Sequence, residues 1–497
     1  MAQKTKTLTV QITLEKATGN FWIDNGLVAL YRRLGEGDFS VEEVLQKLVQ
    51  ELAQPTGNQG EYFDPQTRTL RTYEKKNWVY PSNLFIKATP KAEKIRYEGR
   101  DYFTAPPEYN LKLTFGREGA CDVCGAAQPL TDAKMWMFPF AVDPGKFGNF
   151  YPGVKRGMKL CPRCALAGLA GYLAWLWRAQ GRDALHIFLF HTDLRALDRL
   201  HRTVLRPLQA KTQAGGGNVP LPFWGPYLHE STLALLLELF SHVDRSNLLS
   251  DEGRRLLAEF LGAGPAPPPA PLRLYTVTGT PGQAFNMTGF REFSRFHELY
   301  RLYRAWKNLF QVDNPHVLLV QVFRQFQTRQ NRQYETLWRD RIAWSILEFQ
   351  DPFPFVEDFL FDARAREKNP GPLSFGTLDV FGLYAKEVLK MEEQLLKTLA
   401  GFGHTLGRTA HDKNEMGLLY ALRNAKNADE FFKVLNDVQF RLELTVPEVL
   451  LAIEPGERIK GSPWKRVKTL LSIYAMNAYL LASRGQAQEK KEGESHE

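Results

Sequence analysis

Two short stretches decide how this chain is organised: Cys121-Asp122-Val123-Cys124 and Cys161-Pro162-Arg163-Cys164. They contain all four cysteines of the sequence, in two matched CxxC pairs. Two thiolates three positions apart on a tight turn occupy adjacent corners of a tetrahedron, and a second such pair completes the shell around Zn²⁺ and leaves no position for water. Gly125 and Pro162 suit the turns of such a site. The pattern therefore predicts a closed, structural zinc site.

Two other interpretations of these cysteines are open. In the first, the four thiols are unrelated buried side chains. In the second, one pair is a redox dithiol, although no thioredoxin-like pattern surrounds either pair. The spacer between the pairs is longer than the commonest ribbon spacing, which predicts an inserted loop or hairpin. That insert is rich in glycine and aromatic residues, and residues 144–164 carry five basic side chains and no acidic one. A flexible basic loop held at its base by zinc is suited to probing DNA.

Length and composition bound the class of protein. A chain of 497 residues predicts two to four domains, and 44% hydrophobic with 24% charged residues is typical of soluble globular proteins. The N-terminus lacks the apolar core of a signal peptide, and the longest apolar run, 165–177, is too short to span a bilayer. Thiols that hold metal rather than form disulfides indicate a reducing compartment. We therefore expect a cytoplasmic protein with no membrane partner.

The positive charge is large and unevenly distributed. The net charge is +9 and the isoelectric point is about 9.1. Residues 65–100 carry nine Lys/Arg against three acids, and residues 291–341 carry ten against five. A solvated charged face explains any one of these segments, but three such segments interleaved with aromatic residues favour a nucleic-acid partner.

Hydrophobic periodicity predicts an α+β protein: an irregular mixed N-terminal region with an inserted four-cysteine zinc knuckle or ribbon, followed by an all-α C-terminal helical bundle. Alternating or continuous apolar runs predict strands at 8–14, 185–190 and 272–277, the last of these being the final strand. Residues 55–118 predict short strands or loops. The helical pattern covers 27–34, 41–52, 165–179, 231–240, 253–261, 290–310, 315–349, 378–400, 414–423, 428–440, 446–453 and 463–483. Asp24 is placed to cap the first helix.

The composition along the chain also predicts where the domains begin and end. A flexible loop at 214–218 and a polyproline spacer at 264–271 interrupt the middle of the chain. The expected parts are an N-terminal α+β region at 1–120, the zinc insert at 121–164, the rest of the large domain at 165–377, the helical bundle at 378–484 and a disordered tail at 485–497.

Catalytic motifs are missing from the sequence. It contains no GxxxxGK[ST], no GxGxxG that opens a helix after a strand, and no GxSxG. His411-Asp412 is an isolated dipeptide without the other motifs of a helicase-nuclease. We therefore expect a protein that binds and does not catalyse.

A further motif precedes the cysteines: Thr18-Gly19-Asn20-Phe21-Trp22-Ile23-Asp24-Asn25-Gly26-Leu27. With the two CxxC pairs and the helical C-terminus, it resembles the CXXC-CXXC proteins of type I-B CRISPR systems, which form the large subunit of the Cascade surveillance complex. The resemblance implies a prokaryotic, non-catalytic subunit. Such a subunit recognises the protospacer-adjacent motif on double-stranded DNA, assists R-loop formation, holds the displaced strand and recruits the helicase-nuclease. The implied partners are CRISPR RNA, target DNA and the backbone, handle-binding and small subunits.

Basic and polar side chains near aromatic residues are the predicted DNA contacts. For motif recognition they are Lys75, Lys76, Asn77, Lys155, Arg156 and Lys159; for the displaced strand, Arg324, Arg329 and Arg332; and in the C-terminal bundle, Arg408, Lys413, Arg423 and Lys426. The C-terminal bundle looks like the small-subunit fold. An internal start at Met391 or Met416 is therefore a hypothesis for a separate small subunit.

Two alternative functions come from other classes. A stand-alone zinc-containing nucleic-acid-processing enzyme requires an acidic metal cluster or a Cys/His nucleophile, and neither is evident in the sequence. A transcription-type adaptor that docks through its zinc ribbon fits the net charge, but it rarely needs so long a chain rich in aromatic residues.

Overall fold

The computed structural model describes most of the chain. The described residues are 8–78, 93–106, 111–134, 137–138, 157–180, 183–210, 217, 219, 221–223, 225–263, 272–280, 286–312, 315–330, 333–367 and 371–494. The chain splits into two compact units: Met1–Pro220 with Ser246–Phe296, and Leu221–Arg245 with His297–Glu497. Helices and strands occur in both, and the C-terminal part is helical, which confirms the mixed α and β class. The finer domain limits stay a prediction, as does the spacer at 264–271, which lies outside the described residues.

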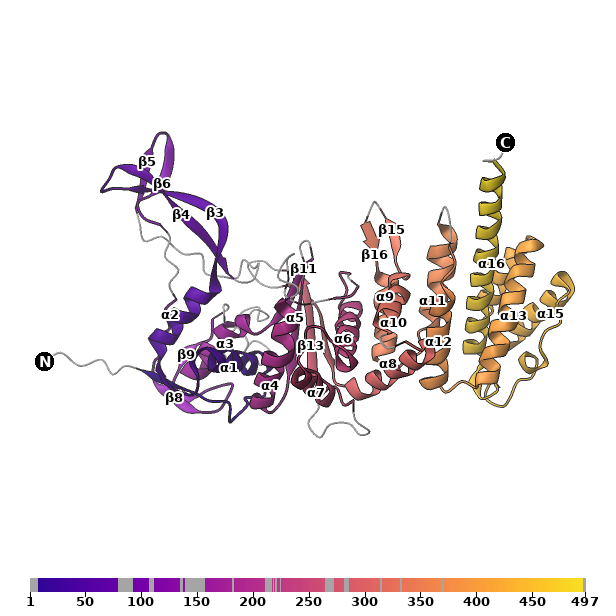
Figure 1. Cartoon of the computed structure of the whole chain (residues 1–497), viewed down its shortest axis with the longest axis horizontal. Helices are drawn as coiled ribbons and strands as arrows, with labels where there is room; N and C mark the ends of the chain where they lie inside the picture. The colour runs from indigo at the N-terminus through magenta and orange to yellow at the C-terminus, as the bar shows by residue number, and fades with distance from the viewer. Residues whose placement is uncertain are drawn as a thin grey trace. The chain divides into compact units, whose positions relative to one another are not determined.

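The first unit contains small antiparallel sheets and helices (Figure 1). Its helical segments are α1 (Phe21–Leu34), α2 (Val41–Leu52), α3 (Pro162–Ala170), η3 (Gly171–Leu173), α4 (Leu194–Leu200), η4 (His201–Leu205), α5 (Arg206–Ala210) and α7 (Asp251–Phe260). Its strands are β1 (Thr9–Ile12), β2 (Gly37–Ser40), β3 (Ala53–Asp64), β4 (Thr69–Trp78), β5 (Lys94–Tyr97), β6 (Arg100–Phe103), β7 (Glu118–Ala120), β8 (Ala127–Pro129), β9 (Thr131–Asp132), β10 (Lys159–Leu160), β11 (Leu176–Gln180), β12 (Asp183–Phe190), β13 (Arg273–Thr280) and β14 (Asn286–Phe293).

Helix α1 starts earlier than predicted and uses a different cap. The Asn20 side chain accepts hydrogen bonds from the backbone N–H groups of Trp22 and Ile23, so Asn20 is the N-cap. Asp24 is not the cap, and this prediction was wrong. Its buried carboxylate accepts hydrogen bonds at 2.8 Å from the backbone N–H and the hydroxyl of Thr18. The turn before α1 is therefore closed by two side chains of the same motif.

The largest sheet has the order β11-β12-β13-β14, with each pair antiparallel. Helix α1 packs on β12 and α3, and the rings of Trp22, Trp175 and Phe188 contact one another in the core. The predicted helix 165–179 was wrong in its second half, because α3 ends at Ala170 and Leu176 already pairs with Ile187 in the sheet. Nor is the strand at 272–277 the last one, since β14 follows it.

The second unit is mainly helical. Its helical segments are α6 (Leu228–Asp244), α8 (Phe296–Phe310), α9 (His316–Arg324), α10 (Leu337–Leu347), α11 (Phe353–Asp358), η5 (Phe359–Ala363), η6 (Arg364–Arg366), α12 (Phe375–Glu387), α13 (Glu393–Asp412), α14 (Met416–Asn424), α15 (Ala428–Leu442), η7 (Glu448–Leu450) and α16 (Trp464–Glu494). Its short hairpins pair β15 (Thr328–Gln330) with β16 (Gln333–Glu335) and β17 (Arg458–Ile459) with β18 (Ser462–Pro463). Helix α16 lies along α13 (Figure 1).

Three predicted segments of this unit differ from the structure. Residues 290–293 belong to β14, so the helix predicted at 290–310 begins at Phe296. The helix predicted at 315–349 is two helices separated by the β15–β16 hairpin. Near the C-terminus, 446–453 forms only a 3-10 turn, and α16 continues to Glu494, so it includes residues 485–494, which we expected to be disordered. Alanine, glutamine, glutamate and lysine in that tail have high helix propensity.

Within the described part of the chain, no helix is both long enough and apolar enough to span a membrane.

Candidate metal centre and nucleic-acid interface

The first cysteine pair lies on the turn between β7 and β8. The N–H of Cys121 donates to the carbonyl of Ala126 at 2.9 Å, and the N–H of Gly125 donates back to the carbonyl of Cys121 at 2.9 Å. Gly125 has φ +73°, a left-handed conformation that glycine adopts without strain. The hairpin and its glycine thus bring Cys121 and Cys124 to one side of the turn.

The second pair lies where β10 meets α3. Cys161 is the N-cap of α3, and Pro162 occupies the first helical position, where its missing N–H costs no hydrogen bond. Cys164 follows in the first turn of the same helix. The N-terminus of a helix carries partial positive charge, which partly offsets the cost of placing thiolates at these two buried positions.

Hydrogen bonds connect the two cysteine pairs to each other and to the N-terminal part of the chain. The N–H of Asp122 donates to the carbonyl of Lys159 at 2.9 Å, and the N–H of Lys159 donates to the Asp122 carboxylate at 2.7 Å. Arg163, inside the second pair, donates to the backbone carbonyl of Lys16 at 2.9 Å. The cysteine cluster therefore joins three stretches that are far apart in the sequence.

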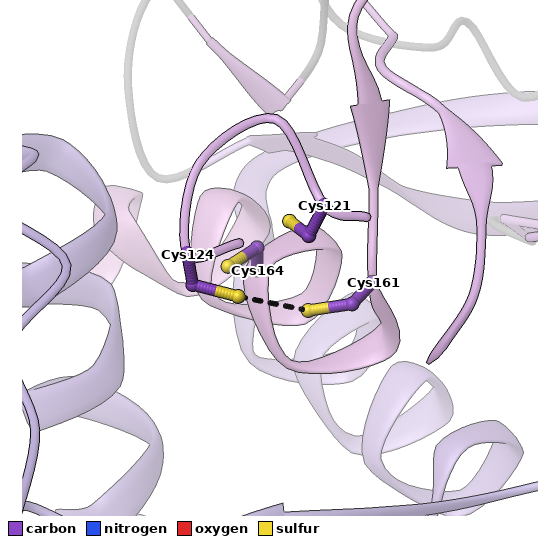
Figure 2. Close-up of side chains that lie close together, drawn as sticks. All are labelled: Cys121, Cys124, Cys161 and Cys164. Atoms are coloured by element: carbon purple, nitrogen blue, oxygen red, sulfur yellow. Dashed lines mark hydrogen bonds between the residues drawn. The ribbon is translucent and has the colours of Figure 1, made fainter. Parts of the chain in front are cut away.

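The four sulfur atoms form one compact cluster (Figure 2). All of them lie within 4.8 Å of one another, and the Sγ atoms of Cys124 and Cys161 are 3.6 Å apart. A disulfide requires about 2.05 Å, so these are free thiols. A tetrahedral Zn²⁺ with Zn–S bonds of about 2.3 Å places its sulfurs roughly 3.8 Å apart. The cluster fits such an ion after a small contraction.

Crowding of the sulfur atoms separates the thiol pKa values. The hydrogen bond from Cys161 lowers the pKa of Cys121, and the same bond raises the pKa of Cys161 to about 12. The pKa of Cys164 is also raised, first by its hydrogen bond to Cys121 and then by the one to Cys161. A metal ion that binds this cluster displaces the remaining protons, so its affinity rises with pH.

The motif at 18–27 packs directly on the helix that carries the second pair. The indole N–H of Trp22 donates to the carbonyls of Met137, at 2.6 Å, and Gly168, at 2.9 Å. A Cβ on Gly26 would lie 1.9 Å from the backbone oxygen of Ala167, so only glycine permits this approach of α1 to α3. The motif and the cysteine cluster, which are separate in the sequence, are parts of one packing unit.

The residues predicted to read the protospacer-adjacent motif lie on two different strands or outside the described residues. Lys75 and Lys76 are exposed on β4, and only the backbone of Asn77 is described there. Lys159 lies on β10, and its ammonium pairs with the Asp132 carboxylate at 2.5 Å. Lys155 and Arg156, with the rest of the glycine-rich insert, lie outside the described residues.

In the second unit, two of the predicted strand-holding arginines lie together. Arg324 and Arg329, both exposed, line the same cavity of about 760 Å³, whereas Arg332 lies outside the described residues. Tyr334, which is 63% exposed, and Trp338 add aromatic surface to the lining. Arginines beside accessible rings are the combination that binds a single nucleic-acid strand.

Two further arginines of this cavity, Arg364 and Arg366, were not predicted from the sequence. Arg364 pairs with Glu367 and Arg366 with Asp362, each at 3.2 Å, whereas Arg324 donates to a backbone carbonyl and Arg329 has no ion pair among the described residues. Four described arginines thus face two carboxylates, and the cavity is positive. The Arg-Ala-Arg sequence was the available signal, but nothing in its spacing from Arg324 indicated proximity.

The four basic residues predicted in the C-terminal region lie on α13 and α14 or directly after them. Arg408 on α13 and Lys426 after α14 are exposed, and Lys413 pairs with Glu443 at 3.0 Å. The Arg423 guanidinium contacts the carboxylates of Asp358, at 2.9 Å, and Asp362, at 2.5 Å, which raises its pKa further. These two carboxylates neutralise the charge of Arg423.

Searches of protein-family models, curated proteins and solved structures find no match to this chain. The assignment of function therefore rests on the site itself.

Proposed function

We propose that this chain is the large subunit of a type I CRISPR surveillance complex of the Cascade kind. The observation that carries the proposal is the packing of the Thr18–Leu27 motif onto the CxxC-bearing helix α3. These are the two features on which the family resemblance rests, and their contact gives them a common structural role. The positive cavity of the second unit adds a surface suited to a nucleic-acid strand.

The metal is Zn²⁺, bound by Cys121, Cys124, Cys161 and Cys164. A soft set of four thiolates on two turns favours zinc over magnesium or calcium, and four protein ligands leave no open position for catalysis. The metal's role is to hold the β7–β8 turn against the start of α3. A metal-bound cluster of reduced thiols also supports a cytoplasmic location.

Recognition of the protospacer-adjacent motif belongs to the first unit in this proposal. Lys75 and Lys76 on β4 supply exposed positive charge for the DNA backbone. Asn77, Lys155 and Arg156 remain candidates on sequence grounds alone. Because the protein reads only the short motif while base pairing with the CRISPR RNA reads the target, few specific side chains are needed.

The displaced strand is held at the cavity of Arg324 and Arg329 in this proposal. Backbone phosphates would lie against the guanidinium groups and bases would stack on Tyr334 or Trp338. The other partners are CRISPR RNA, the backbone, handle-binding and small subunits, and the helicase-nuclease that cuts the target. The subunit itself carries out no catalysis.

Strand binding is tested with the double variant Arg324→Gln/Arg329→Gln and a labelled single-stranded DNA titrated at several salt concentrations. Loss of two phosphate contacts lowers the affinity about tenfold or more and reduces the slope of log K against log salt by roughly 1.4. The matched control is Lys397→Gln/Lys433→Gln, which removes the same charge from exposed positions on α13 and α15. Equal effects of the two pairs would mean that only net charge matters and would remove the cavity from the proposal.

A further inference from the structure

A second positive cavity lies in the first unit, apart from the residues assigned above. Its volume is about 600 Å³, in the range of small-molecule sites. Arginines from three elements line it: Arg32 and Arg33 in the last turn of α1, Arg202 in the π-helical turn η4 and Arg206 at the start of α5. These residues are brought together only by the fold, because α1 and η4 are separated by more than half of the first unit's sequence.

The cavity has more positive charges than partners for them. Arg33 pairs with Glu51, and Arg32 lies 3.8 Å from the Asp198 carboxylate, beyond hydrogen-bond distance. Arg202 and Arg206 are exposed and have no ion pair among the described residues. Two guanidinium groups thus remain uncompensated on a concave surface.

The pKa of Arg32 reflects this excess of positive charge. Burial lowers the pKa of the Arg32 guanidinium, and the next largest cause is repulsion by Arg206, with smaller contributions from Arg33 and Arg202. Like charges held this close destabilise the free protein unless an anion lies between them. Among the described residues, the buried Oδ1 of Asp198 has no hydrogen-bond partner, so this carboxylate is not held by one guanidinium.

One histidine of the lining is held by a hydrogen bond and is neutral. His201, which lines the cavity, is buried. Its Nε2 lies 2.8 Å from the Oδ1 of Asn25, a residue of the motif at 18–27. Burial lowers the pKa of His201 to about 3, so it is uncharged at neutral pH. The turn His201–Leu205 is π-helical, a local departure that occurs frequently at functional sites because the extra residue redirects the side chains around it.

We propose that this cavity binds a phosphate group of a nucleotide-sized ligand, held between Arg32, Arg202 and Arg206. Guanidinium groups bind phosphate oxygens through paired, charge-assisted hydrogen bonds, and a doubly charged phosphate neutralises the two uncompensated arginines. The inference stands on this geometry and does not depend on the function proposed above.

Isothermal titration calorimetry on the full-length, metal-loaded chain, freed of nucleic acid, tests the proposal. The probes are pyrophosphate, adenosine 5′-monophosphate and adenosine, which separate binding of phosphate from binding of the nucleoside. We expect the two phosphate-bearing probes to bind with Kd below about 1 mM and adenosine not to bind. The variant Arg202→Gln/Arg206→Gln, which changes exposed side chains, should weaken phosphate binding tenfold or more.

The matched control is Arg195→Gln/Arg199→Gln, which removes two exposed charges from α4, just before the π-helical turn. Unchanged binding by this control, with loss in the cavity variant, supports the site. Equal weakening in both variants, or no binding of either phosphate probe, overturns it. Neither outcome bears on whether the chain co-purifies with CRISPR RNA, so the two proposals fail independently.

Discussion

At the scale of single residues, the four cysteines and the glycine at 26 determine how the first unit is assembled. Cys164 is fully buried and Cys161 nearly so, in a region where α3 contacts α1. The CxxC spacing was enough to predict which thiols cluster, because two positions on each turn leave little freedom for the sulfurs. It was not enough to predict that Arg163, within the second pair, donates hydrogen bonds to the backbone carbonyls of Thr13 and Lys16, which follow β1.

Replacement of Cys121 by serine should remove the metal and unfold the first unit. Metal binding is part of the folding free energy of such sites, so the loss is expected to be several kcal/mol. Bound zinc measured by mass spectrometry and the unfolding transition measured by circular dichroism give the two readouts. Val123→Ser, in the same turn but without a sulfur ligand, is the control. A soluble, folded Cys121→Ser variant that has lost its zinc would contradict the structural role.

The contact between α1 and α3 predicts a large effect of Gly26→Ala. The new Cβ would lie 1.9 Å from the Ala167 backbone oxygen, so the helices must separate, at a cost of roughly 1–3 kcal/mol or more. The control is Gly401→Ala in α13, where nothing lies within 4 Å and alanine should stabilise the helix by about 0.5–1 kcal/mol. Thermal unfolding distinguishes the two. A Gly26→Ala variant as stable as the wild type would refute this packing.

At the scale of elements, hydrophobic periodicity predicted most helices. It failed where tertiary contacts determine whether a segment forms a helix or a strand. The run 165–177 is apolar enough for a buried helix, yet Gly171 lies against the Trp22 ring, and the chain from Leu176 pairs with β12 instead. The turn at Thr328–Glu335 was also missed, because its arginines and glutamines are equally compatible with an exposed helix. The cavity of Arg32 and Arg202 could not be predicted, since spacing along the sequence carries no information on contacts between distant helices.

The packing of α11 against α16 predicts a pH-dependent stability. Burial raises the pKa of Glu357 on α11 to about 7, from an ordinary 4.5, and its Oε1 has no hydrogen-bond partner among the described atoms. Between these two values the folded state holds a proton that the unfolded chain has lost, so stability falls as pH rises through this window. Glu357→Gln should therefore stabilise the protein by about 3 kcal/mol above pH 7 and change little below pH 4.5.

Denaturant unfolding at pH 4.5, 6 and 8 measures this difference, with the exposed Glu387→Gln on α12 as the control. Parallel pH profiles for the wild type and Glu357→Gln would show that this carboxyl is not the cause.

At the scale of the whole molecule, two compact units each carry a concentration of positive charge. The first holds the cysteine cluster and the cavity of Arg32, Arg202 and Arg206, and the second holds the cavity of Arg324 and Arg329. The net charge of +9 therefore includes localised sites as well as a solvated surface. Such localisation is expected of a subunit that contacts nucleic acid at more than one place.

The RNA that accompanies the protein shows whether the chain belongs to a CRISPR surveillance complex. The tagged chain is purified from its native operon context, and the co-purifying RNA is sequenced. We expect short RNAs of uniform length with a repeat-derived 5′ handle, together with the other subunits. A chain that purifies alone, without RNA, and still binds nucleic acid would contradict membership of such a complex and favour a stand-alone nucleic-acid-processing protein.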